Sequence, residues 1–335
     1  MKLIIQIPCF NEAETLAVAL AALPRTVPGF DSVEWLVIDD GSTDRTEEVA
    51  KLCGVDYIVS HPQNQGLARA FMTGINACLA LGADVIVNTD ADNQYAADDI
   101  PALVKPILEC RAEIVVGARP IAEIRHFSAV KKFLQRLGSF VVRIASGTEI
   151  PDAPSGFRAM SRSAALQLIV YNKYTYTLET IIQAGQLGIP ITSVPVRVNE
   201  ELRPSRLVKS ISSYIMRNIF TILRIFVLYR PFLFFMTIGS LLFLCGMFIS
   251  MRFLIYYFSG AGNGHIQSLI LGAVLLSAGV GTWLMAVISS LLASNRRLLE
   301  DIRTTLNSTS RKFIPHLWSR HTQGPASSGP ASGRD

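Results

Sequence analysis

Residues 84–95 read Asp84-Val85-Ile86-Val87-Asn88-Thr89-Asp90-Ala91-Asp92-Asn93-Gln94-Tyr95, a short apolar run followed by two closely spaced carboxylates. The β-branched run is typical of a buried strand, and the acidic residues follow where that strand ends. Carboxylates at positions i and i+2 can hold Mg²⁺ or Mn²⁺, which prefer oxygen ligands and commonly bridge protein carboxylates to substrate phosphates. Alone, such a triplet is most often a solvated turn, so its interpretation depends on the rest of the chain.

Two other apolar runs also end in acidic residues. Residues 3–7 lead into Pro8-Cys9-Phe10-Asn11-Glu12, and residues 33–38 lead into Asp39-Asp40-Gly41-Ser42-Thr43-Asp44. Helical patterns separate the runs, and this βαβα order over residues 1 to about 200 predicts an α/β fold with a doubly wound, mostly parallel sheet. The acidic strand ends should then meet at one edge of the sheet. Ser42 or Asp44 can equally serve as a helix cap.

The C-terminal part is too apolar for an ordinary soluble domain. Of the 335 residues 50% are hydrophobic, and the mean hydropathy is positive. The excess lies in two stretches, about 231–258 and 266–292, each long enough to span a bilayer. Residues 205–230 read as an amphipathic helix in the bilayer interface, with an ordinary helix packed on the domain as the alternative.

The charge distribution indicates a membrane rather than nucleic acid. Lysine and arginine exceed aspartate and glutamate by 31 to 26, a net charge of +5, and basic residues flank the apolar stretches. The connecting segment 259–265 has neither lysine nor arginine, so the positive-inside rule places both outer flanks in the cytoplasm. We therefore expect a multi-pass protein of the inner (plasma) membrane. Its parts are a cytoplasmic catalytic domain (1–204), an interfacial helix (205–230), two transmembrane helices (231–292) and a basic, then disordered, cytoplasmic tail (293–335).

The polar residues at the predicted strand ends match the needs of a nucleotide sugar. Glu12 and Asp40 can accept hydrogen bonds from ribose or base. Asp90 and Asp92 can hold a divalent metal, with Gln94 as a further oxygen ligand. Such a metal would stabilise a departing nucleoside diphosphate. Cations for the phosphates are available at Arg119, Arg203 and Arg206.

As a set, these motifs resemble family 2 glycosyltransferases with a GT-A-type fold, in particular the dolichol-phosphate mannose synthase branch and bacterial polyprenyl-phosphate glycosyltransferases. The resemblance spans residues 1 to about 210, and the paired apolar stretches match the bacterial relatives too. The matching segments are Pro8-Cys9-Phe10-Asn11-Glu12, Ile38-Asp39-Asp40-Gly41-Ser42-Thr43-Asp44, Asn64-Gln65-Gly66, Asp90-Ala91-Asp92-Asn93-Gln94, Gly117-Ala118-Arg119 and Ser155-Gly156-Phe157-Arg158.

The resemblance implies a role for each group of site residues. Nucleotide contacts fall to Pro8, Asn11, Glu12, Asp39, Asp40 and Asp90, and the Mg²⁺ or Mn²⁺ site to Asp90, Asp92 and Gln94. Phosphate contacts fall to Arg119, Lys131, Lys132, Arg203 and Arg206. Asp92 would act in catalysis through the metal. Asp152 is the catalytic-base candidate, although a phosphate acceptor is already anionic, so Asp152 could instead only orient other groups.

The resemblance also implies a reaction: inverting transfer of one sugar from a UDP- or GDP-sugar to a polyprenyl (undecaprenyl) phosphate at the cytoplasmic membrane face, in cell-envelope synthesis. Three alternatives are a glycosyltransferase with another acceptor in polysaccharide or glycolipid synthesis, a processive synthase and a silent binding protein. The tryptophans lack the Gln-x-x-Arg-Trp context of processive synthases, and repelling carboxylates have no use in a silent protein. Sugar, base, prenyl length and oligomeric state, including a homo-oligomer, stay open.

Overall fold

The computed structural model describes residues 1–120, 129–168, 170, 176–199, 224, 227, 229–259 and 266–310. At its centre is a seven-stranded sheet of order β3-β2-β1-β4-β6-β5-β7. The strands are β1 (Lys2–Cys9), β2 (Ser32–Asp39), β3 (Tyr57–Ser60), β4 (Val85–Asn88), β5 (Ile114–Ala118), β6 (Arg158–Ser161) and β7 (Ile191–Pro195). The sheet domain also contains α1 (Leu16–Ala22), α2 (Thr46–Leu52), α3 (Leu67–Ala80), the 3₁₀ turn η1 (Ala97–Asp99), α4 (Ile100–Leu108), α5 (Ala129–Ser146), α6 (Arg162–Gln167) and α7 (Thr177–Leu187).

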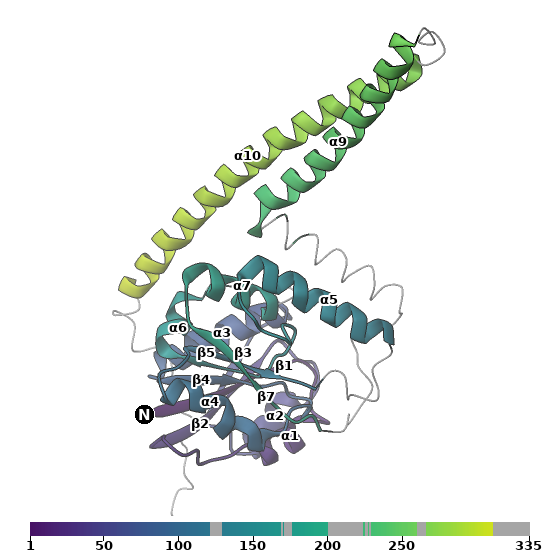
Figure 1. Ribbon diagram of the computed structural model, residues 1–335. Helices are drawn as coiled ribbons and strands as arrows, with labels where there is room; N and C mark the ends of the chain where they lie inside the picture. The colour runs from purple at the N-terminus through teal and green to yellow at the C-terminus, as the bar shows by residue number, and fades with distance from the viewer. Residues whose placement is uncertain are drawn as a thin grey trace, which may run out of the picture.

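Helices pack on both faces of the sheet (Figure 1). Along β1, Leu3 and Ile5 face a core shared with α1, α2 and α4, whereas Ile4 faces a second core shared with α3 and α6. A strand covered on both faces must be apolar at successive positions, which explains the uninterrupted runs in the sequence. The expected α/β fold is confirmed.

One strand departs from the parallel order. β1 pairs in parallel with β2 and β4, and β5 pairs in parallel with β7, but β6 lies antiparallel between β4 and β5. The start of β6 therefore lies at the same edge as the ends of β4 and β5. The segment 155–158 is thereby brought to the acidic edge of the sheet.

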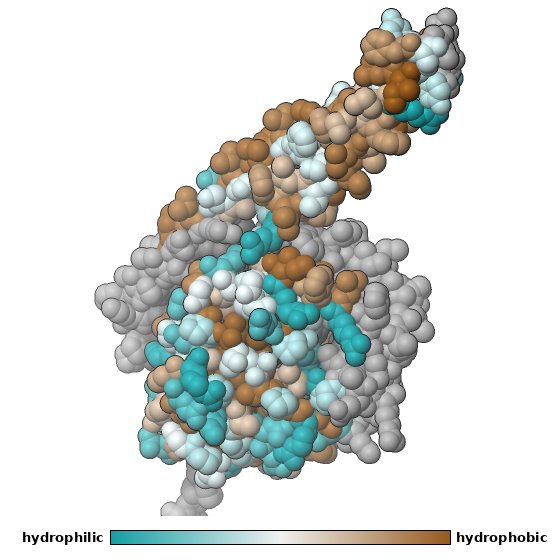
Figure 2. Space-filling model, in the orientation of Figure 1, coloured by the Kyte–Doolittle hydropathy of each residue, from teal (hydrophilic) through white to brown (hydrophobic). Residues whose placement is uncertain are grey.

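Two long apolar helices follow the domain, as expected. α9 (Pro231–Phe258) and α10 (Ile266–Ser310) pack against each other, and Pro231–Phe258 and Ile266–Asn295 are long and apolar enough to cross a membrane. Figure 2 shows apolar side chains along this pair, in contrast to the mixed surface below it. α10 continues past Leu292 to Ser310 and touches α6. The expected interfacial helix and the end of the tail lie largely outside the described residues.

The two apolar helices approach closely at paired glycines. A Cβ on Gly239 would lie 3.0 Å from the carbonyl oxygen of Gly279, and one on Gly246 would lie 2.9 Å from that of Gly272. The glycines of each helix are seven residues apart, so both pairs fall on one helix face. In lipid, where no hydrophobic effect drives helices together, such close backbone approach is a main source of association.

Replacing Gly246 by leucine should separate α9 from α10, because the added carbons meet backbone atoms of Gly272 and Leu276. We expect a cost of about 1–3 kcal/mol, the usual range for overpacking. The matched control is Gly281→Leu in α10, where a Cβ meets nothing within 4 Å. The midpoint of thermal unfolding in detergent should fall for Gly246→Leu alone; equal midpoints for both variants would contradict the glycine contact.

The start of α9 is fastened to the sheet domain. The hydroxyl of Tyr229 donates to Glu179 Oε1 of α7 at 2.9 Å, and both residues are buried. Next in the chain, Arg230 Nε donates to the carbonyl of Ala145 in α5 at 3.0 Å. The apolar helix pair therefore begins directly against the layer formed by α5 and α7.

Candidate functional site

The polar residues gather at one edge of the sheet, where β1, β2, β4 and β5 end and β6 begins. In an open α/β sheet this is the edge at which ligands bind. The loops that follow β1 and β2 are joined by hydrogen bonds. Asn11, with a φ of 55°, accepts from the backbone N–H of Thr43 at 2.8 Å, and Ser42 Oγ accepts from the N–H of Asn11 at 2.9 Å. Ser42 in turn donates its N–H to Asp39 Oδ1 at 3.0 Å.

Asp40 is buried, and both of its carboxylate oxygens are engaged. They accept from the backbone N–H groups of Gln65 at 2.9 Å and Gly66 at 2.8 Å, just before α3. His61 Nδ1 lies 2.7 Å from Asp40 Oδ1, and its Nε2 lies 3.0 Å from the hydroxyl of Thr73. Asp40 thus ties the end of β2 to the start of α3. His61 is a residue that motif reasoning missed, because nothing in its local sequence signals this contact.

The expected capping of α2 by Ser42 or Asp44 is wrong: the N-cap is Arg45, which makes no side-chain cap, and Asp44 instead braces the turn before the helix. Asp44 Oδ1 accepts from the N–H of Thr46 at 3.0 Å, and Asp44 Oδ2 accepts from the N–H of Ala13 at 3.1 Å. The hydroxyl of Thr46 accepts from the N–H of Glu12 at 2.8 Å, and Glu12 Oε2 accepts from Thr15. Glu12 is therefore fixed between the two loops. Pro8, which precedes this turn, lies buried in β1 opposite Ile38.

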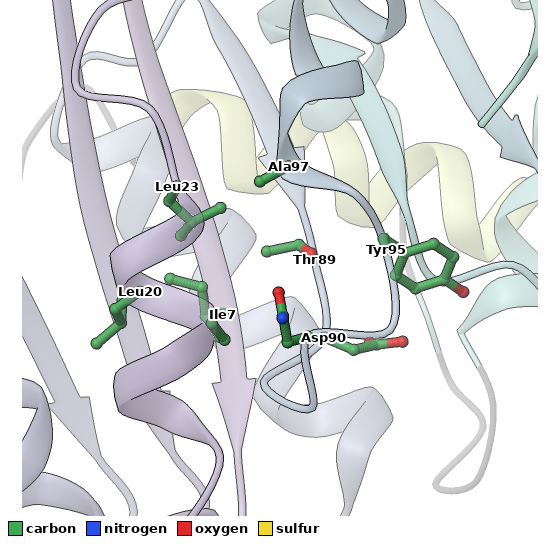
Figure 3. Close-up of a pocket in the computed structure, with 9 residues that line it drawn as sticks. Ile7, Leu20, Leu23, Thr89, Asp90, Tyr95 and Ala97 are labelled. Atoms are coloured by element: carbon green, nitrogen blue, oxygen red, sulfur yellow. The ribbon is translucent and has the colours of Figure 1, made fainter. Parts of the chain in front are cut away.

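Asp90 and Asp92 follow β4 on a tight loop. Asp92 Oδ1 accepts from the N–H of Gln94 at 3.1 Å, and the intervening Asn93 has a left-handed φ of 56°. The carboxylate of Asp90 lies against Gly156, where a Cβ would meet its two oxygens at 2.7 and 2.9 Å. In Figure 3 this carboxylate points away from the apolar side chains of Ile7 and Leu20, toward the side on which Tyr95 lies. A glycine at 156 thus leaves room for the carboxylate.

The electrostatics of this acidic pair call for a cation. Burial, and secondarily the neighbouring carboxylate of Asp92, raise the pKa of Asp90 to about 7. No three His, Cys, Asp or Glu side chains form a complete metal site in the part of the chain that the structure describes. Two carboxylates on one loop nevertheless fit Mg²⁺ or Mn²⁺, which keep several waters and take substrate phosphates as further ligands. The residues present therefore fit a divalent metal shared with a diphosphate.

A buried polar network next to the acidic pair links β1 and β4 to the segment before β6. Gln6 Nε2 donates to Asn88 Oδ1 at 2.9 Å, and Asn88 Nδ2 donates to the carbonyl of Gly156 at 2.8 Å and to the hydroxyl of Tyr176 at 2.9 Å. In addition, the N–H of Gly156 donates to the hydroxyl of Tyr95 at 3.0 Å. Motif reasoning missed Gln6 and Asn88, although a polar residue within an apolar strand was a visible signal.

Arg119 and Asp152 are brought together as a buried ion pair. Arg119 Nε and Nη2 donate to the two carboxylate oxygens at 2.7 and 3.0 Å, and the side chains are 7% and 1% exposed. The predicted phosphate ligand is thus paired with the predicted base. Both carboxylate oxygens of Asp152 are therefore occupied by hydrogen bonds from the guanidinium of Arg119. This geometry favours the orienting role for Asp152 over that of a base.

A second arginine, Arg158, is fully buried at the start of β6. Its guanidinium donates to the carbonyls of Ser155 at 2.9 Å and Ala153 at 2.8 Å, and also to the hydroxyl of Thr180. Burial lowers the pKa of Arg158 to about 10, so the group stays charged at neutral pH. Its positive charge lies below the acidic loop and helps to hold the segment 153–158 in place.

The structure does not show whether the remaining predicted cations reach the site. Lys131 and Lys132 lie in the first turn of α5, where the structure gives their backbone only, and Arg203 and Arg206 lie outside the described residues. The structure therefore brings together the strand-end residues, Arg119 and Asp152. The roles of all these residues stay predictions.

Comparison with known proteins supports a common family. The model of Glycosyl transferase family 2 matches residues 4–169. A UDP-N-acetylglucosamine–dolichyl-phosphate N-acetylglucosaminyltransferase of Methanococcus voltae is 30% identical over 213 residues, 57% of this chain and 83% of the relative. An undecaprenyl-phosphate mannosyltransferase of Micrococcus luteus is 28% identical over 218 residues, 62% of this chain and 88% of the relative.

A solved structure shows the same fold. Glucosyl-3-phosphoglycerate synthase from Mycobacterium tuberculosis, crystallised with Mn²⁺, UDP and glucosyl-3-phosphoglycerate, superposes with a TM-score of 0.51 at 22% identity. The match covers 66% of this chain and 79% of that one. At this identity the likeness concerns the fold alone, and it confirms the expected GT-A-like arrangement.

Proposed function

Because this chain belongs to glycosyl transferase family 2, we propose that it transfers one sugar from a UDP- or GDP-sugar to a polyprenyl phosphate at a membrane surface. The observation that carries this proposal is the combination of two features in one chain. An acidic pair suited to a nucleotide diphosphate and its metal follows β4, and an apolar helix pair begins against α5 and α7. A soluble acceptor would not require the second feature.

In this reaction an oxygen of the acceptor phosphate attacks the anomeric carbon of the sugar. The bond from that carbon to the nucleoside diphosphate breaks, and the configuration inverts. Asp90 and Asp92, with Gln94 as a further ligand, would hold a divalent metal, which would supply Lewis-acid stabilisation of the leaving group. Asp152 holds Arg119 by two hydrogen bonds, and we assign Arg119 to the phosphates. Since the acceptor phosphate is already anionic near neutral pH, the step needs no strong base.

The other loops supply the nucleoside site in this proposal. Asn11, Glu12 and Asp39 lie at the ends of β1 and β2, beside the acidic pair. Asp40 acts there by fixing the turn before α3, because both of its oxygens already accept backbone N–H groups. UDP and GDP would be distinguished by hydrogen bonds from these loops to the base.

The apolar helices explain how a lipid acceptor reaches the site. Tyr229 and Arg230 join the start of α9 to α7 and α5, so the sheet domain stays next to the bilayer that α9 enters. A lipid headgroup is thereby confined near the domain, which raises its local concentration. Basic residues on both outer flanks of the helix pair support a cytoplasmic catalytic domain at the inner (plasma) membrane.

The direct test supplies the purified full chain in detergent with radiolabelled UDP- and GDP-sugars and undecaprenyl phosphate. We expect one donor to give an acid-labile glycolipid with Mg²⁺ or Mn²⁺, and none of it with EDTA, because the leaving group requires the metal. Undecaprenol, which lacks the phosphate nucleophile, is the matched acceptor control. Polymer formation, or transfer to soluble acceptors without lipid product, would instead indicate another acceptor in polysaccharide or glycolipid synthesis.

A further inference from the structure

A segment beyond β7 lies against the loop that carries Asp90 and Asp92. Residues 196–199 run beside residues 94–96, and Val198 forms an antiparallel bridge with Tyr95. The N–H of Asn199 donates to the carbonyl of Gln94 at 2.9 Å, and the N–H of Ala96 donates to the carbonyl of Arg197 at 3.2 Å. The chain thus returns across about a hundred residues to contact the acidic loop.

The side chain of Asn199 closes this contact. Its Nδ2 donates to the carbonyl of Asn93 at 2.9 Å and to the carbonyl of Tyr95 at 3.3 Å, and Asn93 Oδ1 lies 3.5 Å away. A primary amide has two N–H groups, so one side chain serves both carbonyls. Together with its own backbone N–H, Asn199 donates to three successive residues of the loop, Asn93, Gln94 and Tyr95.

The residue at the centre of this contact has an unusual backbone conformation. Asn93 has a φ of 56°, in the left-handed region that costs most residues about 1–2 kcal/mol. It stands between Asp92 and Gln94, two of the proposed metal ligands, and the N–H of Gln94 orients Asp92 Oδ1. A change at Asn93 would therefore alter the positions of both neighbours.

We propose that Asn199 is a positioning residue for the metal site. Its amide holds Asn93 in the left-handed turn and so keeps Asp92 and Gln94 in the arrangement that binds the divalent cation. The inference rests on the proposed function, because it presumes that Asp90 and Asp92 bind the metal. Hydrogen-bonding partners outside the ligand sphere typically change metal affinity by 10–100-fold when removed.

A neighbouring residue, Arg197, serves as the control that distinguishes positioning of the metal loop from general support of the segment 196–199. Arg197 holds the same segment to a different partner: its Nη2 donates to Asp99 Oδ1 at 2.7 Å, and its backbone N–H also donates to Asp99. The side chain of Arg197 is 66% exposed, and it contacts η1 rather than the acidic loop. Loss of an exposed ion pair of this kind has little effect on stability.

The experiment measures Mn²⁺ binding by the full chain in detergent with UDP present, from the electron paramagnetic resonance signal of free Mn²⁺. Asn199→Ala and Asn199→Leu should raise the dissociation constant for Mn²⁺ by about 10–100-fold. Arg197→Gln should change it by less than about threefold, since no loop hydrogen bond is lost. Asn199→Gln, which keeps the amide, should recover part of the affinity. Saturating Mn²⁺ should restore much of the kcat of Asn199→Ala, which a misfolded variant would not show.

The outcomes separate the inference from the proposed function. If wild-type protein binds no Mn²⁺ in the presence of UDP, the proposed metal site is wrong and the inference falls with it. If wild-type protein binds Mn²⁺ and Asn199→Ala binds it equally well, only the inference is overturned. Equal weakening by Arg197→Gln would also overturn it, because the effect would then belong to docking of the whole segment rather than to the amide.

Discussion

Replacing Asp92 by asparagine is expected to lower the rate of sugar transfer about a thousandfold or more while leaving the fold intact. The substitution keeps the shape of the side chain, so the N–H of Gln94 can still donate to the oxygen at the Oδ1 position. What is lost is one of the two negative charges that we propose bind the cation. Stabilisation of the leaving group by a metal is a matter of several kcal/mol, and about 4 kcal/mol corresponds to a thousandfold in rate.

The measurement is the rate of glycolipid formation at saturating donor and acceptor over a range of Mn²⁺ concentrations. Asp98→Asn is the matched control: the same chemical change is made six positions along the chain, on η1, where the side chain is 86% exposed. That variant should keep its activity within about twofold, because an exposed charge contributes little. Near-normal transfer by Asp92→Asn would remove Asp92 from the metal site.

The acidic edge could be predicted because it depends on local patterns. Apolar runs of strand length ended in Glu12, Asp40 and Asp90, and the carboxyl ends of parallel strands meet at one edge of a sheet. The pair of apolar helices could be predicted equally well, since length and hydropathy alone indicate a candidate membrane span. These features need no knowledge of which distant residues meet.

Contacts between distant residues could not be predicted in the same way. Arg119 and Asp152 are 33 positions apart, and only the antiparallel insertion of β6 brings the segment before it to the edge where β5 ends. No local sequence pattern predicts that Asn199 contacts Asn93, or that His61 contacts Asp40. Each of these pairs depends on the strand order, and the alternation of strands and helices predicts a sheet without specifying that order.

The second large effect is expected from Asp90→Asn, which should abolish transfer and yet stabilise the metal-free protein at alkaline pH. Burial and the charge of Asp92 raise the pKa of Asp90 from an ordinary 3.8 to about 7. Between these values the folded protein holds a proton that the unfolded chain releases, so stability falls as the pH rises through this window. Above pH 7 the folded protein carries the full cost of an ionised, partly buried carboxylate. That cost is at most about 4 kcal/mol, and it is smaller where solvent reaches the group.

An asparagine at position 90 carries no such cost at any pH. In EDTA, the midpoint of thermal unfolding of Asp90→Asn should therefore match that of the wild type near pH 3.5, below the unfolded pKa of 3.8, and exceed it by several degrees at pH 8. Adding Mn²⁺ and UDP at pH 8 should reverse the order, because only the wild type gains stability from binding the cation. Asp98→Asn should follow the wild type throughout. A midpoint for Asp90→Asn below that of the wild type at pH 8 in EDTA would mean that the surroundings stabilise the ionised carboxylate. The ionised site would then not lower the stability of the metal-free protein.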